Sequence, residues 1–210
     1  MRYADRMDVE TLRRHYPELN DEPLVPVDLI DNGEELATVA DASQDFLIAN
    51  HFLEHTQDPI ATLQNHLRVL RPGGHLYLAI PLKDASFDAR RPVTSIEHLM
   101  RDHRDGPEGS LEQHYEEWAT LVEGCAQEQL AERIADLRAR DYSIHFHVWD
   151  ESGLLELMAH LQTELHLPFR VKRAKRNHYE LIVILQKTPP VPGAPERPRR
   201  AAQRTAASGR

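Results

Sequence analysis

The 210-residue sequence contains a single cysteine, Cys125, which excludes a disulfide framework and a cysteine-rich zinc site. No apolar run approaches the roughly 20 residues that a membrane-spanning helix requires. The first residues, MRYADRMDVE, lack the apolar core of a secretory signal. These absences predict a cytoplasmic protein that does not associate with membranes.

Glycine is also scarce, with nine residues scattered along the chain, the first of them Gly33. The pattern Gly-x-Gly does not occur, so the sequence lacks the glycine-rich type of loop that lets a backbone approach a cofactor closely. The formal net charge of −9 argues against a protein that coats nucleic acid. What is present, 40% hydrophobic and 28% charged residues, is typical of a globular domain.

Between residues 45 and 81 the pattern predicts a strand, a helix and a second strand. The continuous apolar run Phe46–Ala49 is typical of a strand covered on both faces, as in a parallel sheet. Asp58 can accept the free amides of a first helical turn, and Pro59 suits the first helical position. One apolar face then recurs at helical spacing, formed by Ile60, Leu63, Leu67 and Leu70.

The turn Pro72-Gly73-Gly74 is predicted to end this helix, and the next strand runs from His75 to Pro81. Two strands joined by such a helix form a βαβ unit, whose crossover is almost always right-handed. From Pro168 onward the sequence predicts two further strands with a turn near residues 175–178. This hairpin would add an antiparallel strand to the parallel sheet.

The remaining segments are shorter or more polar. Residues 8–15 predict a helix, and residues 24–30 predict a strand at a sheet edge because Pro26 cannot donate to a ladder. Residues 84–143 are charged and predict an inserted helical cap. The segment 144–149 is short and extended, and Asp150 can cap a helix that follows it.

We expect one domain over residues 1–187 and a disordered tail rich in proline, arginine and alanine over residues 188–210. The arginines of the tail could contact nucleic acid or anionic lipid. A solvated tail that contacts neither is the simpler interpretation of this composition.

Three strings, DFLIANHFLEH, DPIATLQNHLRVLRPGG and HLYLAIP, together resemble the second half of class I S-adenosylmethionine-dependent methyltransferases of the type-11-like kind. The resemblance covers about residues 3–187, interrupted by the insert. It implies an α/β fold with a Rossmann-like sheet and a terminal antiparallel hairpin. It also implies S-adenosylmethionine as cofactor and a small-molecule methyl acceptor, which the sequence does not identify.

The resemblance also implies roles for residues that match the positions of the family. Asp5 matches the acid that ends the second strand and binds the ribose hydroxyls, a task for which a carboxylate is suited. Asp28 and Asp31 are both candidates for the acid that contacts the adenine. Asn50 and His51 match the end of the fourth strand, beside the methionine part of the cofactor, and His51 is the catalytic candidate nearest the transferred methyl group.

Members of that family begin with a strand and a loop of the form (D/E)xGxGxG, which this sequence lacks. By the resemblance, the chain starts at the second strand, and the absent first strand would lie between the second and the fourth. Phe46–Ala49 would then present an unpaired apolar edge. Three explanations stay open: a start codon assigned too late, a truncated gene, or a partner or second copy that supplies the strand. We favour the first.

Thirteen histidines are many for this length, and five are candidate substrate-binding residues: His98, His103, His114, His145 and His147. Because alternate residues of a strand face the same side, His145 and His147 could act together. They could ligate a metal with Glu97, Asp102 or His114, supply a general base, or line a pocket. Their spacing matches no metal motif, so the sequence assigns no metal.

The leading hypothesis is therefore a methyltransferase that transfers a methyl group from S-adenosylmethionine by in-line attack of a small acceptor. The alternative is a catalytically inactive methyltransferase-like module that binds a partner at its open sheet edge, which the missing glycine loop favours. A histidine-based metal hydrolase is a weaker hypothesis.

Glu54 and His55 are expected to be packing residues before the helix.

Overall fold

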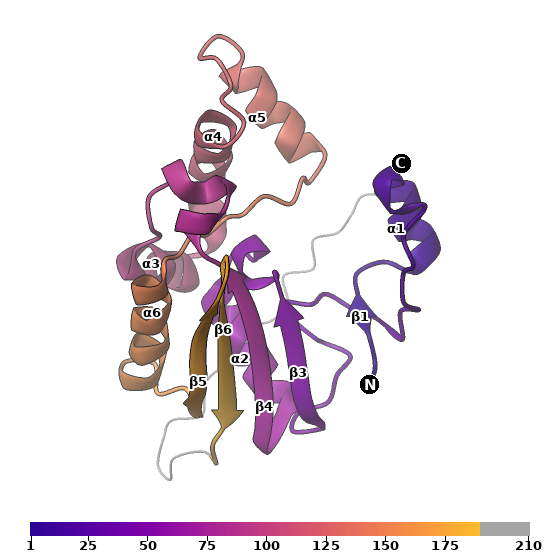
Figure 1. Cartoon of the computed structure of the whole chain (residues 1–210), viewed down its shortest axis with the longest axis vertical. Coiled ribbons are helices and arrows are strands. Elements are labelled where there is room, and N and C mark those ends of the chain that lie inside the picture. Colours follow the sequence, from indigo (N-terminus) through magenta and orange to yellow (C-terminus); the bar gives the residue numbers. More distant parts are fainter. Residues whose placement is uncertain (190–210) are drawn as a thin grey trace.

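The computed structural model describes residues 1–189, in which the chain forms two sheets (Figure 1). In the smaller sheet, β1 (Ala4–Asp5) lies parallel to β2 (Leu29–Ile30). The larger sheet has the order β3-β4-β6-β5, with bounds Gln44–Asn50, Leu70–Pro81, Glu180–Lys187 and Phe169–Asn177. Residues 190–210, most of the predicted tail, lie outside the described residues.

Six α-helices accompany the sheets in the described part of the chain: α1 (Val9–His15), α2 (Pro59–Val69), α3 (Ile96–Asp105), α4 (Leu111–Leu121), α5 (Leu130–Ala139) and α6 (Glu151–Thr163). Short 3-10 turns lie between them. The Asp8 side chain caps α1, and the Asp150 side chain caps α6 by accepting from the Gly153 amide. The helix over residues 8–15 and the cap at Asp150 were both predicted and are confirmed.

The βαβ unit is confirmed, since β3 and β4 are parallel and α2 joins them. Asp58 accepts from the Ala61 amide at the start of α2, as its position predicts. The helix ends at Val69, earlier than predicted, and β4 begins directly at Leu70. The turn residue Gly73 has a φ of +88°, a conformation that glycine adopts without steric cost.

The C-terminal hairpin is confirmed as well. β6 is antiparallel to both β4 and β5, and its turn lies at residues 178–179. The main core lies where α2, α3 and α6 pack on this sheet, with Leu63, Leu99 and Leu157 all nearly inaccessible to solvent. The α/β sheet with a terminal antiparallel strand is therefore the predicted Rossmann-like fold.

The prediction that β3 is covered on both faces is wrong within the described residues. Phe46 is 50% exposed and Ile48 is 51% exposed, although Ala49, which faces the core, is buried. Figure 1 shows β1 and α1 beside the free edge of β3, but β1 forms no ladder with it. A cavity of about 540 Å³ lies between them, lined by residues of β3 and by residues near the N-terminus. That a partner or second copy pairs with this edge stays a prediction.

The insert divides into two parts. α3 joins the main core, whereas α4 and α5 form a second core with the segment 144–146. Figure 1 shows α4 and α5 beyond the end of the sheet at which β3 terminates. The segment 144–149 is buried but forms no strand; Trp149 makes only an isolated bridge with Leu82.

The strand predicted before residue 31 needs correction, and the helices can be compared with the requirements of a membrane span. The strand expected over residues 24–30 is reduced to Leu29–Ile30, because the segment containing Pro26 stays irregular. Among the helices of residues 1–189, none combines the length and the apolarity that crossing a bilayer would demand.

Candidate functional site

The carboxyl ends of the parallel strands carry a group of polar side chains. Asn50 is the last residue of β3 and is exposed, and His51 follows it with a φ of +47°. Glu180 opens the antiparallel strand β6 opposite Pro81, so it lies at the same edge of the sheet. His51 Nε2 lies 2.9 Å from Glu180 Oε2, and this contact fixes the imidazole in front of β3. Open α/β sheets bind their ligands at this end of the strands.

Glu54 lies in the 3-10 turn Leu53–His55 that follows β3. It is 1% exposed, and neither carboxylate oxygen makes a hydrogen bond in the described structure. Burial, together with the negative charge of Asp88, raises the pKa of Glu54 to about 8. The nearest ion-pairing group is His51, whose Nδ1 is 3.6 Å from Glu54 Oε1. A buried carboxylate without hydrogen bonds is uncommon because its desolvation is not compensated.

Two histidines face Glu54, and we refer to Glu54, His55, His145 and Asp88 as the first cluster. One ligand atom each of Glu54, His55 and His145 lies within 4.8 Å of the others. His145 Nδ1 is 2.7 Å from Asp88 Oδ2, and Arg91 Nη1 donates to Asp88 Oδ1 at 2.9 Å. Burial alone would raise the pKa of Asp88, but these hydrogen bonds from His145 and Arg91 outweigh it and lower the pKa. Burial and the neighbouring His145 lower the pKa of His55 to about 4.

A second cluster consists of His98, Asp102, His114 and His147, contributed by α3, α4 and the segment 144–149. Nε2 of His98 is 3.1 Å from Nε2 of His114 and 3.0 Å from Asp102 Oδ2. The Ser110 hydroxyl donates to the same Asp102 oxygen at 2.6 Å. His147 is fully buried, and its Nε2 lies 3.2 Å from the Gln57 carbonyl oxygen. This cluster ties the insert to the main body.

The structure separates His145 from His147, which the sequence suggested could act together. His145 joins the first cluster and His147 the second. His103 joins neither, since its Nδ1 is 2.9 Å from Asp58 Oδ2 at the start of α2. The substrate-binding roles of these histidines stay predictions.

The three acidic cofactor candidates differ in how many of their carboxylate oxygens accept hydrogen bonds from the protein. Asp31 accepts from the amides of Ala37 and Thr38 and from the Thr38 hydroxyl, so both oxygens hold its own loop. Asp28 Oδ2 accepts from the Tyr3 amide. Asp5 Oδ1 accepts from the Met7 amide, and Oδ2 has no hydrogen bond within the described residues. Asp5 and Asp28 therefore each keep one carboxylate oxygen for a ligand, whereas Asp31 keeps none.

From the sequence alone, we did not name Glu54, His55, Asp88 or Glu180 as candidate site residues. Glu54 and His55 were expected to be packing residues, yet they form the centre of the first cluster. Their place immediately after a strand that ends in Asn-His was the available signal. For Asp88 and Glu180 the sequence offers no signal, because their partners are 57 and 129 positions away.

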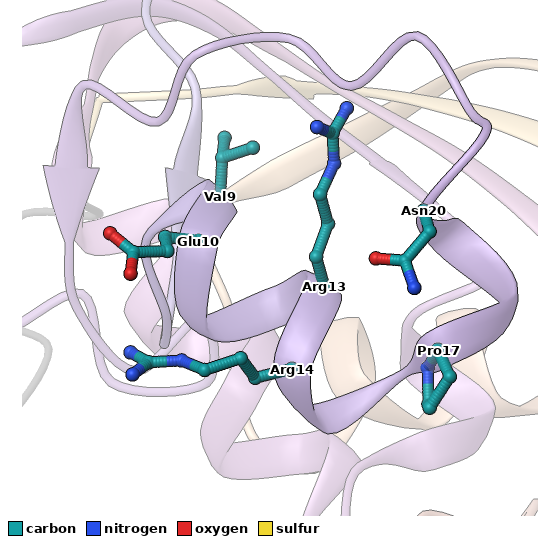
Figure 2. A pocket seen from close by; sticks show the side chains of 6 residues that line it. All are labelled: Val9, Glu10, Arg13, Arg14, Pro17 and Asn20. Atoms are coloured by element: carbon teal, nitrogen blue, oxygen red, sulfur yellow. The ribbon is translucent and has the colours of Figure 1, made fainter.

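A second cavity, of about 620 Å³, lies on α1 and the 3-10 turn after it (Figure 2). Figure 2 shows Glu10 and Arg14 on one side of α1 and Arg13 pointing toward the loop that follows Asn20. Arg13 Nη2 donates to the Glu22 carbonyl oxygen at 3.1 Å, so this arginine supports the loop. None of the predicted site residues lines this recess.

Comparison with known proteins gives one family and several distant structures. A family model described as a methyltransferase domain matches residues 12–166. No curated protein matches the chain. The solved structures include a Thermotoga maritima protein described as a SAM-dependent methyltransferase, with 14% identity over 78% of this chain and 65% of that chain and a TM-score of 0.41.

Two further solved structures illustrate the spread of names. A Bacillus halodurans protein named as a methyltransferase has 12% identity over 89% of this chain and 82% of that chain, with a TM-score of 0.44. A Rhodobacter sphaeroides protein named as a zinc-dependent alcohol dehydrogenase has 12% identity over 85% of this chain and 70% of that chain, with a TM-score of 0.48. The family match spans most of the chain and includes the whole βαβ unit. The chain belongs to the methyltransferase domain family.

Proposed function

We propose that this chain is a methyltransferase that binds S-adenosylmethionine and methylates a small molecule held in front of β3 and β4. The observation that carries the proposal is the meeting of Asn50, His51 and Glu180 at the carboxyl end of the parallel strands. Proteins of this family generally use S-adenosylmethionine. The net charge of −9 favours a small acceptor over nucleic acid.

The residues present are compatible with the cofactor. Asp5 ends β1 with one carboxylate oxygen free of hydrogen bonds in the described structure, which suits recognition of a ribose diol. Asn50 is exposed at the end of β3 and offers both a donor and an acceptor. The cavity of about 540 Å³ reaches from Asn50 and Phe52 to the residues before Asp5. When bound, the cofactor would supply an electrophilic methyl group on a sulfonium centre.

The chain's own contribution would then be positioning. His51 is held by Glu180, so one face of its imidazole is fixed relative to the end of β3. We assign to His51 the role of orienting a hydroxyl or amine of the acceptor toward the methyl group of the cofactor. Tyr179, whose ring centroid is 5.9 Å from that of His51, borders the same place and is 53% exposed. An exposed aromatic beside a fixed polar group suits an acceptor with an apolar part.

Calorimetric titration of the full chain with S-adenosylhomocysteine and S-adenosylmethionine tests the proposal. We expect micromolar binding, and at least 10-fold weaker binding by Asp5→Asn. Asp105→Asn is the matched control, because Asp105 is an acid on α3 whose partner is Arg104 rather than a ligand. Absence of binding of both compounds to the intact chain would overturn the proposal.

The second candidate is a methyltransferase-like module without catalysis, which one observation favours. Phe46 and Ile48 lie on β3 beside an edge that no strand pairs with in residues 1–189. An apolar strand edge of this kind can accept another strand. This candidate predicts no cofactor binding, so the same titration distinguishes it from the enzyme.

A further inference from the structure

The first cluster contains a carboxylate that the protein itself does not satisfy. Both oxygens of Glu54 are buried and accept no hydrogen bond in the described structure. Its backbone, by contrast, is held firmly, because the Phe146 amide donates to the Glu54 carbonyl oxygen at 2.7 Å. The side chain is therefore kept in a buried place where an ionised carboxylate is strongly disfavoured unless a cation compensates it.

The two histidines beside Glu54 are oriented in the way that metal ligands usually are. His145 Nδ1 must donate to Asp88, since the ionised carboxylate can only accept. His55 Nδ1 lies 3.0 Å from the Ile144 carbonyl oxygen, which can only accept, and 3.1 Å from the Ser143 hydroxyl, which can accept as well. Each neutral ring then has its lone pair on Nε2. Histidines that bind metals commonly donate their other nitrogen to a carboxylate or a backbone carbonyl in this manner.

The three side chains are gathered closely enough for one ion to draw them together. One ligand atom of each of Glu54, His55 and His145 lies within 4.8 Å of the others. Bonds to zinc are about 2.0–2.2 Å for nitrogen and oxygen, so two ligand atoms of a tetrahedral ion lie about 3.4 Å apart. A pair at the 4.8 Å limit would close by about 1.4 Å through side-chain rotation when the ion binds.

A proton on Glu54 is the competing explanation. It would remove the charge, but its O–H would still need an acceptor, and no acceptor lies within hydrogen-bond distance of either oxygen in the described residues. A cation held between Glu54, His55 and His145 would compensate the carboxylate without needing an acceptor. The ligand set of two histidines and one carboxylate suits divalent ions such as Zn²⁺, Mn²⁺ and Fe²⁺.

We propose that Glu54, His55 and His145 form a binding site for a divalent transition-metal cation, with Asp88 as the residue that positions His145. Three protein ligands leave at least one coordination position open. His51 lies 3.6 Å from Glu54, so this position is beside the proposed acceptor site. That the open position takes an oxygen of the acceptor rests on the proposed function, whereas the binding of the cation does not.

The test uses the full chain after removal of metal with a chelator. Co²⁺ is titrated and its visible absorption recorded, and Zn²⁺ affinity is obtained by competition. We expect one strong site in the wild type, at least 100-fold weaker binding by Glu54→Gln, and similar weakening by His55→Gln. His103→Gln is the matched control, because His103 pairs with Asp58 outside both clusters, and it should bind within about 3-fold of the wild type.

Folding and cofactor binding are read separately. Circular dichroism of each metal-free variant establishes that it is folded, and S-adenosylhomocysteine is titrated without metal. The metal site is supported if the wild type binds Co²⁺ or Zn²⁺ and both Glu54→Gln and His55→Gln lose this binding. This conclusion does not depend on the result of the S-adenosylhomocysteine titration. No metal binding up to millimolar concentration overturns it, and so does binding that both variants retain. If only S-adenosylhomocysteine fails to bind, the result counts against the proposed function and leaves the metal site unchanged.

Discussion

The two histidine clusters are built from the same residue types and are buried to a similar depth, but they satisfy their polar atoms differently. In the second cluster Asp102 Oδ2 receives the Ser110 hydroxyl and lies 3.0 Å from His98 Nε2. In the first cluster the oxygens of Glu54 receive nothing. A carboxylate that is compensated by internal hydrogen bonds has a structural explanation, and one that is not compensated indicates an external partner.

The histidines of the two clusters differ in the same way. His98 Nδ1 is 2.7 Å from Arg101 Nη2, so this nitrogen accepts and Nε2 carries the proton that faces Asp102. His55 and His145 instead have Nδ1 beside acceptors, namely the Ile144 carbonyl oxygen at 3.0 Å and Asp88 Oδ2 at 2.7 Å. His147 Nδ1 is the exception in the second cluster, because it is buried and makes no hydrogen bond. One ligand atom each of His98, His114 and His147 also lies within 4.8 Å of the others, so proximity alone does not distinguish the clusters; the hydrogen-bond partners of their side chains do.

The largest effect is expected from Arg91, which supports the segment that carries both His145 and His147. It is 1% exposed, pairs with Asp88 and with Glu117 at 2.7 Å, and donates to the His145 carbonyl oxygen. Arg91→Met should lower the free energy of unfolding by about 3–5 kcal/mol, because buried Asp88 keeps only His145 as a charged partner and the His145 carbonyl oxygen loses its donor. Urea denaturation followed by circular dichroism measures it. Arg170→Met, at an exposed position outside both clusters, is the control, and equal losses in both variants would contradict the expectation.

The next effect concerns His66, a buried histidine outside both clusters. Its Nε2 is 2.9 Å from the Gly33 carbonyl oxygen, and burial lowers its pKa from 6.5 to about 4. Above pH 6.5 the imidazole is neutral in both states, so its contribution is fully present. As the pH falls from 6.5 to 4 the unfolded chain takes up the proton first, and about 3 kcal/mol of stability is lost.

Unfolding free energies at pH 7, 6, 5 and 4.5 measure this slope. The variant His66→Gln should reduce it by about one proton, since the titrating group is removed. His15→Gln serves as the control because His15 is exposed. If the His66 variant keeps the wild-type slope, the acid sensitivity belongs to the clusters and not to burial of a single histidine.

A matched pair of carboxylate substitutions tests the comparison of the clusters directly. Asp102→Asn should cost about 1.5–3 kcal/mol, because two hydrogen bonds to a charged group are weakened. Glu54→Gln should cost nothing in the metal-free protein, because the raised pKa of about 8 keeps Glu54 mostly uncharged at pH 7 and its side chain makes no hydrogen bond that glutamine would lose. Chemical denaturation in the presence of a chelator gives both values. Similar losses in the two variants would show that the clusters do not differ as described.

Several parts of the fold were predictable because their causes are local. Asp58 and Asp150 cap helices through the amides three residues ahead, so the sequence alone locates these helix starts. The run Phe46–Ala49 predicted a strand, and the segment from His75 predicted its parallel neighbour. The exposed face of β3 was not predictable from that run, because an apolar sequence does not determine whether other elements pack on both faces of the strand.

The candidate site was predictable only where a strand end determines it. Asn50 and His51 follow directly from the end of β3 and the general location of ligand sites in such sheets. The sorting of the histidines was not predictable, because His145 and His147 meet partners on different helices and turns far away in the chain. Alternation predicted a common face for the two histidines, but the segment forms no strand, so the alternation rule does not apply to it.

The smallest effect is expected at His51, and it decides whether this residue belongs to the chemistry or to the structure. His51 is 39% exposed in its pair with Glu180, and such partly exposed pairs contribute about 0–1 kcal/mol. Its φ of +47° is more easily adopted by asparagine, which offsets part of the lost contact. His51→Asn should therefore change the free energy of unfolding by less than about 1 kcal/mol.

The measurements are urea denaturation, Co²⁺ affinity and methyl transfer on the same protein sample. Retained stability and retained Co²⁺ affinity, with methyl transfer lost, would assign His51 to the acceptor and leave the first cluster as an independent metal site. Loss of Co²⁺ affinity together with methyl transfer would instead mean that the contact between His51 and Glu54 holds that carboxylate in place. The first cluster would then extend to the end of β3, and the boundary between metal site and acceptor site would have to be redrawn.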